Sequence, residues 1–230
     1  MTDVQWPGVA LHVVSGKGGS GKTTVAAALA LALAREGRRT LLIEVEGRQG
    51  IAQLFDTPPL PYEERKVAVA PGGGEVWALP IDPQEALIDY LDTFYNLRRA
   101  GAALRRMGAV DFATTIAPGL RDVLMTGKAI EVVRRSEKNA ANAYEAVVLD
   151  APPTGRIAKF LNVTTEVSGL AKTGPIRKHA DMVMNIIRSP RTRVHLVTLL
   201  EEMPVQETVD GIDELRRDHL PVGGIFVNRR

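Results

Sequence analysis

Residues 16–23 read GKGGSGKT and are the part of the chain best suited to chemistry. They fit the phosphate-loop pattern G-x-x-x-x-G-K-[ST], in which glycines let successive backbone N–H groups turn toward phosphate oxygens without a Cβ clash. The lysine of the pattern, Lys22, reaches the β- and γ-phosphates, and the hydroxyl of Thr23 ligates Mg²⁺. The segment therefore predicts a site for ATP and Mg²⁺.

The same segment also satisfies a weaker pattern, because Gly16, Gly18 and Gly21 match the dinucleotide fingerprint G-x-G-x-x-G. A dinucleotide site needs small residues at the positions of Lys22 and Thr23, and such a site does not include a Mg²⁺ ligand. We therefore interpret the loop as one that binds a nucleoside triphosphate.

A second lysine, Lys17, follows the first glycine of the loop. Because Lys22 already serves the phosphates of its own chain, Lys17 needs another role. At this position it resembles the lysine that marks the deviant phosphate-loop ATPases, a group that includes septum-site, plasmid-partition and arsenite-pump ATPases. The resemblance implies that two chains face each other and that each sends Lys17 into the other's site, as an arginine finger does. The alternative is a solvated loop charge.

Two carboxylates follow apolar runs that read as strands. Glu46 comes directly after residues 40–45, where it could orient the attacking water, and Asp150 ends the run 145–150, where it could hold Mg²⁺ through water. Simpler roles remain open, with Glu46 as a solvent-facing strand end and Asp150 as a turn or cap residue. The predicted catalytic residues are Lys17, Lys22 and Glu46, and the predicted Mg²⁺ ligands are Thr23 and Asp150.

The elements that would position these residues follow from the hydrophobic pattern. Helical stretches separate most of the strand-like runs, which is typical of βαβ units and a largely parallel sheet. Val67 and Val69 predict a short hairpin arm against Val76 and Trp77. We expect an α/β fold, a three-layer phosphate-loop NTPase with a mostly parallel sheet and an all-helical insertion. The strand-like runs are residues 9–14, 40–45, 75–81, 145–150, 193–199 and 221–227.

The helical insertion is expected at residues 84–138, inside a single ATPase domain that spans residues 1–230. Its apolar residues follow helical spacing and carry no strand pattern. They could line a groove for a hydrophobic client, or they could simply form the core of the insertion. These residues are Leu91, Phe94, Leu97, Leu104, Met107, Phe112 and Met125.

The composition limits the classes of partner that the sequence predicts. The chain has 29 basic and 27 acidic residues mixed along its length, so nothing predicts a nucleic-acid partner. It has no cysteine, which excludes disulfides and thiolate zinc sites. No signal peptide is apparent, and the longest apolar run, residues 25–34, is too short to cross a bilayer. The sequence predicts a cytoplasmic protein, either free or peripheral at the inner face of the membrane.

Several further motifs make the resemblance specific. Residues 150–156, DAPPTGR, resemble the switch II segment DTAPTGH of the arsenite-pump and tail-anchored-protein-targeting ATPases. Residues 116–122, 201–208 and 225–228 resemble three further segments of that family, in the family's order. The last of these implies that Asn228 contacts adenine. The residues predicted to contact the nucleotide are Gly16, Lys17, Gly18, Gly19, Ser20, Gly21, Lys22, Thr23, Thr24 and Asn228.

The chain also departs from that family's pattern. It has Glu46 and Gly47 where the family has Asp-Pro, and glutamate is one methylene longer than aspartate. The Cys-x-x-Cys that holds zinc between eukaryotic dimers is absent, so we expect no zinc. The sequence stops two residues after Asn228, where the family continues with another strand and helix. We therefore expect a fragment or an abbreviated member.

The resemblance implies a Mg²⁺-dependent ATPase that works as a homodimer or as a heterodimer with a paralogue. ATP hydrolysis would be coupled to binding or transport of a hydrophobic or anionic client, such as a client protein or a membrane partner. The alternative is a weakly hydrolysing, nucleotide-gated binding subunit that pairs with a more active paralogue, which Glu46 favours. A partition- or septum-type ATPase predicts a basic DNA-facing patch or an amphipathic C-terminal helix, and the sequence shows neither.

Overall fold

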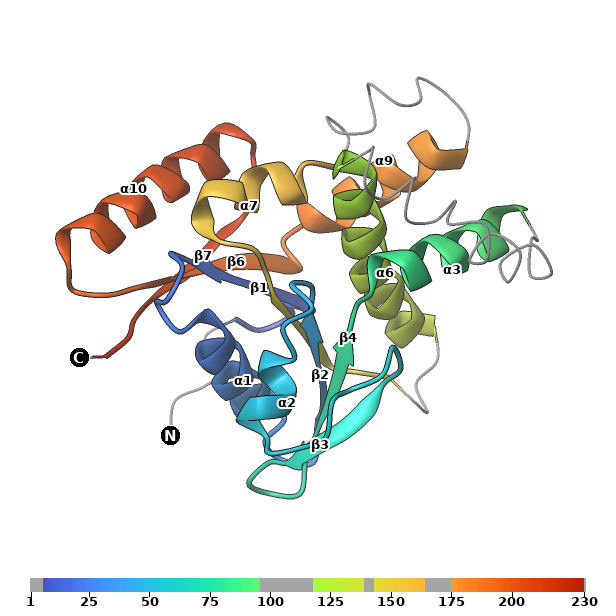
Figure 1. The fold of residues 1–230 in the computed structure, drawn as a ribbon, viewed down its shortest axis with the longest axis horizontal. Coiled ribbons are helices and arrows are strands. Elements are labelled where there is room, and N and C mark those ends of the chain that lie inside the picture. Colours follow the sequence, from blue (N-terminus) through green and yellow to red (C-terminus); the bar gives the residue numbers. More distant parts are fainter. Residues whose placement is uncertain (1–5, 96–117, 139–142, 164–174, 230) are drawn as a thin grey trace.

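The computed structural model describes residues 6–95, 118–138, 143–163 and 175–229, and these form a sheet between two layers of helices (Figure 1). The strand order is β3-β4-β2-β5-β1-β6-β7. Neighbouring strands run parallel except for the antiparallel hairpin of β3 and β4, so the predicted mostly parallel sheet is confirmed. The strands are β1 Leu11–Gly16, β2 Arg39–Glu44, β3 Arg65–Val69, β4 Glu75–Pro80, β5 Ala146–Asp150, β6 Thr192–Thr198 and β7 Val222–Val227.

Helices cover both faces of the sheet, which confirms the three-layer α/β architecture. On one face lie α1 (Lys22–Leu33) and the short α2 (Gly50–Leu54). The opposite face is covered by a larger group. That group contains α6 (Pro118–Lys138), α7 (Thr154–Leu161), α9 (Pro175–Ile187) and α10 (Glu202–Arg217), with α3 (Pro83–Tyr95) packed beside α6. Among the described residues, no helix is both long and apolar enough to cross a membrane.

The central strands are buried on both faces, which explains their continuous apolar sequences. Successive side chains of a strand point to opposite faces, so neighbours in sequence enter different cores. Leu149 belongs to the core under α6 and α7, whereas Val148 belongs to the core under α1. This double burial fixes β1 and β5 rigidly, and both strands end at the same edge of the sheet.

The described parts of residues 84–138 are helical and consist of α3 and α6. Residues 96–117 lie outside the described part, and with them Leu97, Leu104, Met107 and Phe112; the same holds for the side chain of Phe94. Met125 is buried in the core, and Leu91 packs against that core. These two side chains therefore contribute to the packing of the domain.

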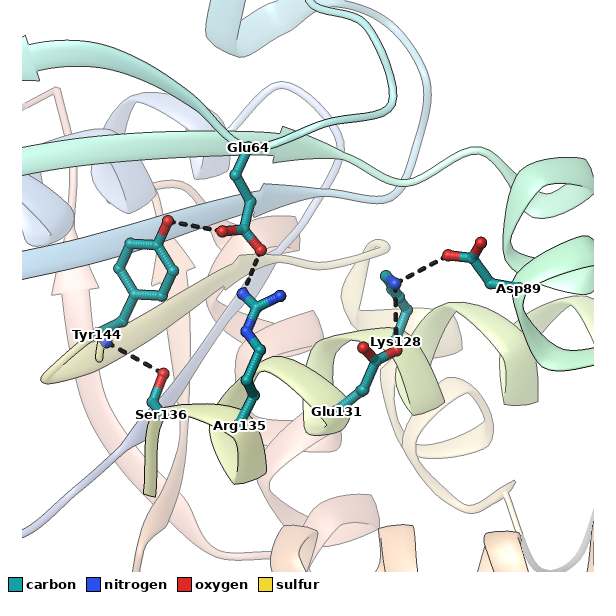
Figure 2. A network of polar contacts seen from close by, with 7 residues as sticks. All are labelled: Glu64, Asp89, Lys128, Glu131, Arg135, Ser136 and Tyr144. Atoms are coloured by element: carbon teal, nitrogen blue, oxygen red, sulfur yellow. Dashed lines mark hydrogen bonds and ion pairs between the residues drawn. The ribbon is translucent and has the colours of Figure 1, made fainter. Parts of the chain in front are cut away.

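A polar network holds α6 to its neighbours (Figure 2). Lys128 Nζ lies 2.8 Å from Asp89 Oδ2 of α3 and 3.1 Å from Glu131. Near the other end of α6, Arg135 pairs with Glu64, which also accepts a 2.8 Å hydrogen bond from the Tyr144 hydroxyl.

Each basic side chain of this network lies beside at least one carboxylate. Burial lowers the pKa of Lys128, but its hydrogen bond to Asp89 and the charge of Glu131 outweigh that effect, so its pKa lies above the ordinary value. The network therefore fixes α6 against α3 and against the segments that precede β3 and β5.

Candidate nucleotide site

The phosphate loop runs from the end of β1 to the start of α1, and two of its glycines are required by their surroundings. A Cβ on Gly16 would lie 2.3 Å from the carbonyl oxygen of Val197 in β6. Gly21 has a φ of +89° and precedes α1, whose N-terminus has no side-chain cap. The first N–H groups of α1 are therefore left for another acceptor, and an anion suits that position.

The predicted Mg²⁺ ligands lie together. The Thr23 hydroxyl donates a 2.7 Å hydrogen bond to Asp150 Oδ2, so the start of α1 meets the end of β5. Lys22 and Asp150 are both buried. The other carboxylate oxygen, Asp150 Oδ1, is buried with no hydrogen-bond partner among the described residues. A hydroxyl and a carboxylate with one uncommitted oxygen fit the preference of Mg²⁺ for oxygen ligands.

The electrostatics at Asp150 favour a cation. Burial raises its pKa to about 6, against the lowering effect of the Thr23 hydrogen bond and the Lys22 charge. Glu44 and Glu46 also raise it, so both carboxylates lie within electrostatic range of Asp150. A divalent cation at this position would offset the crowding of negative charge.

The two glutamates at the end of β2 differ in their surroundings: Glu44 is the last residue of the strand, and Glu46 follows it. Glu44 is buried, and its carboxylate accepts hydrogen bonds from the backbone N–H groups of Gly50 at 3.2 Å and Ile51 at 3.3 Å. It therefore orders the start of α2. The Glu46 side chain is 26% exposed, and its Oε1 lies 4.0 Å from Arg48. Nothing in the sequence singled out Glu44 for this role, because the N–H groups that donate to its carboxylate belong to a later turn.

Lys17 is paired within its own chain. Its Nζ lies 2.9 Å from Glu207 Oε1 on α10, and about a third of each side chain is exposed. The sequence placed Glu207 in a family-like segment but gave no partner for it. An ion pair between partly exposed groups is weak, of the order of 0.2–1 kcal/mol, so it can be exchanged for a stronger contact.

Asn228 lies against the phosphate loop. Its side-chain Nδ2 donates to the Ser20 carbonyl oxygen at 2.9 Å, and its backbone N–H donates to Thr198 at 2.9 Å. The contact with adenine that the resemblance implies stays a prediction. Of the remaining predicted contact residues, Gly18, Gly19 and Thr24 are exposed along the loop and the first turn of α1.

A glycine loop between β1 and α1, with a buried acid at the end of the adjacent β5, defines a phosphate-loop NTPase-like fold. A comparison with protein families identifies the family within this class of NTPases. The model of the anion-transporting ATPases matches residues 10–190, and the chain belongs to that family.

Three curated relatives agree with this assignment and with the resemblance found in the sequence. The chain is 60% identical to ATPase BagA of Mycobacterium tuberculosis (strain ATCC 25618 / H37Rv), over 99% of this chain and 68% of that protein. It is 28% identical to ATPase GET3 of Kluyveromyces lactis, over 83% of this chain and 55% of that protein. It is 25% identical to the arsenical pump-driving ATPase of Acidiphilium multivorum, over 92% of this chain and 39% of that protein.

Proposed function

We propose that the chain hydrolyses ATP in a Mg²⁺-dependent reaction. The observation that carries this proposal is the contact between Thr23 and Asp150, with a free carboxylate oxygen beside the buried Lys22. Bound Mg²⁺ would neutralise phosphate charge between these two residues. Lys22 binds the β- and γ-phosphates, and the loop N–H groups at the start of α1 hold the remaining oxygens.

Two residues are proposed to act on the reacting groups. Glu46 orients the attacking water and accepts its proton, because it follows the strand beside the one that carries Asp150. Lys17 leaves Glu207 when two chains close on ATP and neutralises charge on the phosphates of the facing chain. The pairing chain is a second copy or a paralogue.

The reaction is proposed to drive a client-binding step. Arg156 of α7, which follows the turn after β5, lies 3.4 Å from both carboxylate oxygens of Asp122 in α6. A movement of the turn would therefore reach the helical insertion at residues 84–138, the proposed client-binding part. The client is a hydrophobic segment or an anion, and the insertion takes it up or releases it as the dimer closes and opens.

Replacing each lysine tests the assignment. Lys22→Ala should abolish ATP binding, because Lys22 contacts the phosphates in every state. Lys17→Ala should keep binding and reduce turnover by roughly 10³-fold or more, as removal of a finger-type charge does. Calorimetry of ATP binding and release of phosphate measure the two effects, with the exposed Lys178→Ala in α9 as control. Equal loss of ATP affinity in Lys17→Ala and Lys22→Ala would contradict the role of Lys17 across a dimer.

A second function is favoured by the position of Glu46, which lies near Arg48 and replaces a shorter aspartate of the family. In that case the chain is a weakly hydrolysing, nucleotide-gated subunit that pairs with a more active paralogue. If Glu46 is catalytic, Glu46→Gln should lower turnover by roughly 10²–10⁴-fold with little change in ATP affinity. If the longer side chain has disabled the site, the wild type will be slow and Glu46→Asp will raise the rate.

A further inference from the structure

A small pocket lies where the segment after β2 and the turn after β5 meet α6 and α7. Its volume is about 80 Å³. A cavity needs about 10–15 Å³ on this measure to hold one water molecule, so the pocket has room for several waters or one small tetrahedral anion. The polar side chains that line it are Glu46, Arg48, Arg121, Asp122 and Arg156, and Pro152 forms part of its wall.

The pocket adjoins the candidate nucleotide site. Glu44 and Asp150 are register partners across β2 and β5. Glu46 and Pro152 each follow two residues later, so they lie beyond the sheet edge that also carries the Thr23–Asp150 contact. The Ser15 hydroxyl donates to the Pro152 carbonyl oxygen at 2.6 Å, which fixes this wall of the pocket to β1.

The charges of the pocket leave one cation uncompensated. Two of its three guanidinium groups have carboxylate neighbours in the pocket: Arg156 lies 3.4 Å from Asp122, and Arg48 lies 4.0 Å from Glu46. Arg121 is exposed and makes no ion pair within the part of the chain that the structure describes. Guanidinium groups present planar pairs of N–H donors that match the oxygens of a tetrahedral anion.

The acids in the pocket restrict which anion fits. An ionised carboxylate only accepts hydrogen bonds, so it repels an anion that carries no proton. Hydrogen phosphate has a hydroxyl that it can donate to Glu46, whereas sulfate at neutral pH has none. A pocket with arginines and a carboxylate is therefore selective for a protonated oxyanion.

We propose that this pocket binds inorganic phosphate in a protonated form, held by Arg121 together with Arg48 and Arg156, with Glu46 as acceptor of its hydroxyl. The proposal rests on the proposed function only for the source of the phosphate, which is the product released at the neighbouring site. Phosphate in the pocket competes with Asp122 for Arg156. Its binding therefore loosens the ion pair between α7 and α6.

Equilibrium binding tests the pocket without hydrolysis. The full chain is saturated with Mg²⁺ and ADP, and inorganic phosphate or sulfate is added while binding is measured by calorimetry. We expect phosphate to bind and sulfate to bind at least about tenfold more weakly, since sulfate leaves a carboxylate facing an unprotonated oxygen. Arg121→Ala should weaken phosphate binding by roughly tenfold or more, as expected for loss of a charged donor. Arg177→Ala, at a partly exposed arginine of α9 that pairs with Asp181, should leave it unchanged.

Two further variants keep the test decisive. Arg48 is 78% exposed, so Arg48→Ala should fold and should also weaken phosphate binding. Glu46→Gln should narrow the difference between phosphate and sulfate, because an amide can donate to either anion. The proposal is overturned if phosphate binding survives Arg121→Ala and Arg48→Ala, if phosphate and sulfate bind equally, or if only Lys22→Ala removes binding.

The source of the phosphate is tested separately by single-turnover hydrolysis, in which release of product phosphate is followed with a phosphate sensor. Arg121→Ala should release product faster than the wild type and should be less inhibited by added phosphate. If the chain does not hydrolyse ATP, the proposed function is wrong. The binding of added phosphate in the presence of ADP still tests the pocket, because that experiment needs no hydrolysis. Release that is unaffected by Arg121→Ala, in an active enzyme, overturns the pocket as the site that receives product.

Discussion

Asn228 connects the last described strand to the phosphate loop through a single side-chain hydrogen bond to Ser20. We expect Asn228→Ala to lower ATP affinity by roughly three- to tenfold, since a net hydrogen bond is worth about 1 kcal/mol and the loop loses its support. Titration with ATP measures the effect. Asn228→Asp retains the size but loses the donor, so it should be at least as impaired. Unchanged affinity in both variants would show that Ser20 is positioned without Asn228.

Asp150 offers a test of the proposed magnesium site. Asp150→Asn should weaken binding of Mg²⁺-ATP more than binding of metal-free ATP, because an amide is a poorer ligand for a hard cation. A metal ligand must be deprotonated, and the pKa of Asp150 is raised to about 6. Magnesium affinity of the wild type should therefore fall as the pH drops through about 6, and Asp150→Asn should reduce that dependence to the part that comes from the phosphates of ATP.

Matched titrations with and without the metal, at pH 7.5 and 5.5, check this expectation. The exposed Asp213→Asn in α10 serves as control. If the two affinities of Asp150→Asn fall in parallel, then Asp150 acts as a structural turn residue.

At the scale of elements, α6 and α9 approach each other at a glycine. A Cβ on Gly127 would lie 2.4 Å from His179 Nε2, so Gly127→Ala should push the two helices apart or displace the imidazole. We expect a loss of about 1–3 kcal/mol in the free energy of unfolding, as for other overpacked sites. Urea unfolding measures it.

Two comparisons make this test specific. Gly155 in α7 has nothing within 4 Å of its Cβ position, so Gly155→Ala should be neutral or stabilise by up to about 1 kcal/mol. In a His179→Ala background, Gly127→Ala should no longer destabilise. Persistence of the loss in that background would place its cause elsewhere in α6.

At the scale of the whole molecule, a buried histidine pair joins β1 to β6. His195 Nδ1 accepts from the Gly224 N–H at 3.0 Å, so its Nε2 carries the proton and donates to His12 Nδ1 at 3.0 Å. Trp6 packs edge-on against both rings. Burial is the main cause that lowers the pKa of His12 to about 4 and that of His195 to about 3; the charge of Arg193 contributes to both values, and His12 contributes to that of His195.

This pair predicts how stability depends on pH. Between the ordinary histidine pKa and these lowered values, the unfolded chain binds protons that the folded chain does not, so stability falls as the pH drops from about 6.5. Each histidine contributes a slope of up to about 1.4 kcal/mol per pH unit.

Urea unfolding between pH 7 and 5 checks this slope. His12→Gln keeps an acceptor for His195 and removes one titrating group, so the slope should fall by about half of the pair's share. The exposed His219→Gln should leave it unchanged. A stability that is flat over this range in the wild type would contradict the neutral state of the pair.

The sequence by itself determined the phosphate loop, most of the strands and the mostly parallel character of the sheet, whereas the order of the strands came from the structure. Glycine spacing in residues 16–23 and apolar runs of strand length can be read within a window of a few residues. The proximity of Asp150 to Thr23 is a long-range contact, but it could be expected from the fold class, since parallel strands bring their carboxyl ends to one edge of the sheet.

Only the tertiary structure decided which side chains from distant segments meet. The pairing of Lys17 with Glu207, of Asp122 with Arg156 and of His12 with His195 joins residues far apart in the chain. No local pattern encodes such a contact, because it depends on the packing of whole helices against the sheet and on the rotamers that this packing leaves open. The arginine-lined pocket exists for the same reason: three segments supply its guanidinium groups, and only the fold places them around one space.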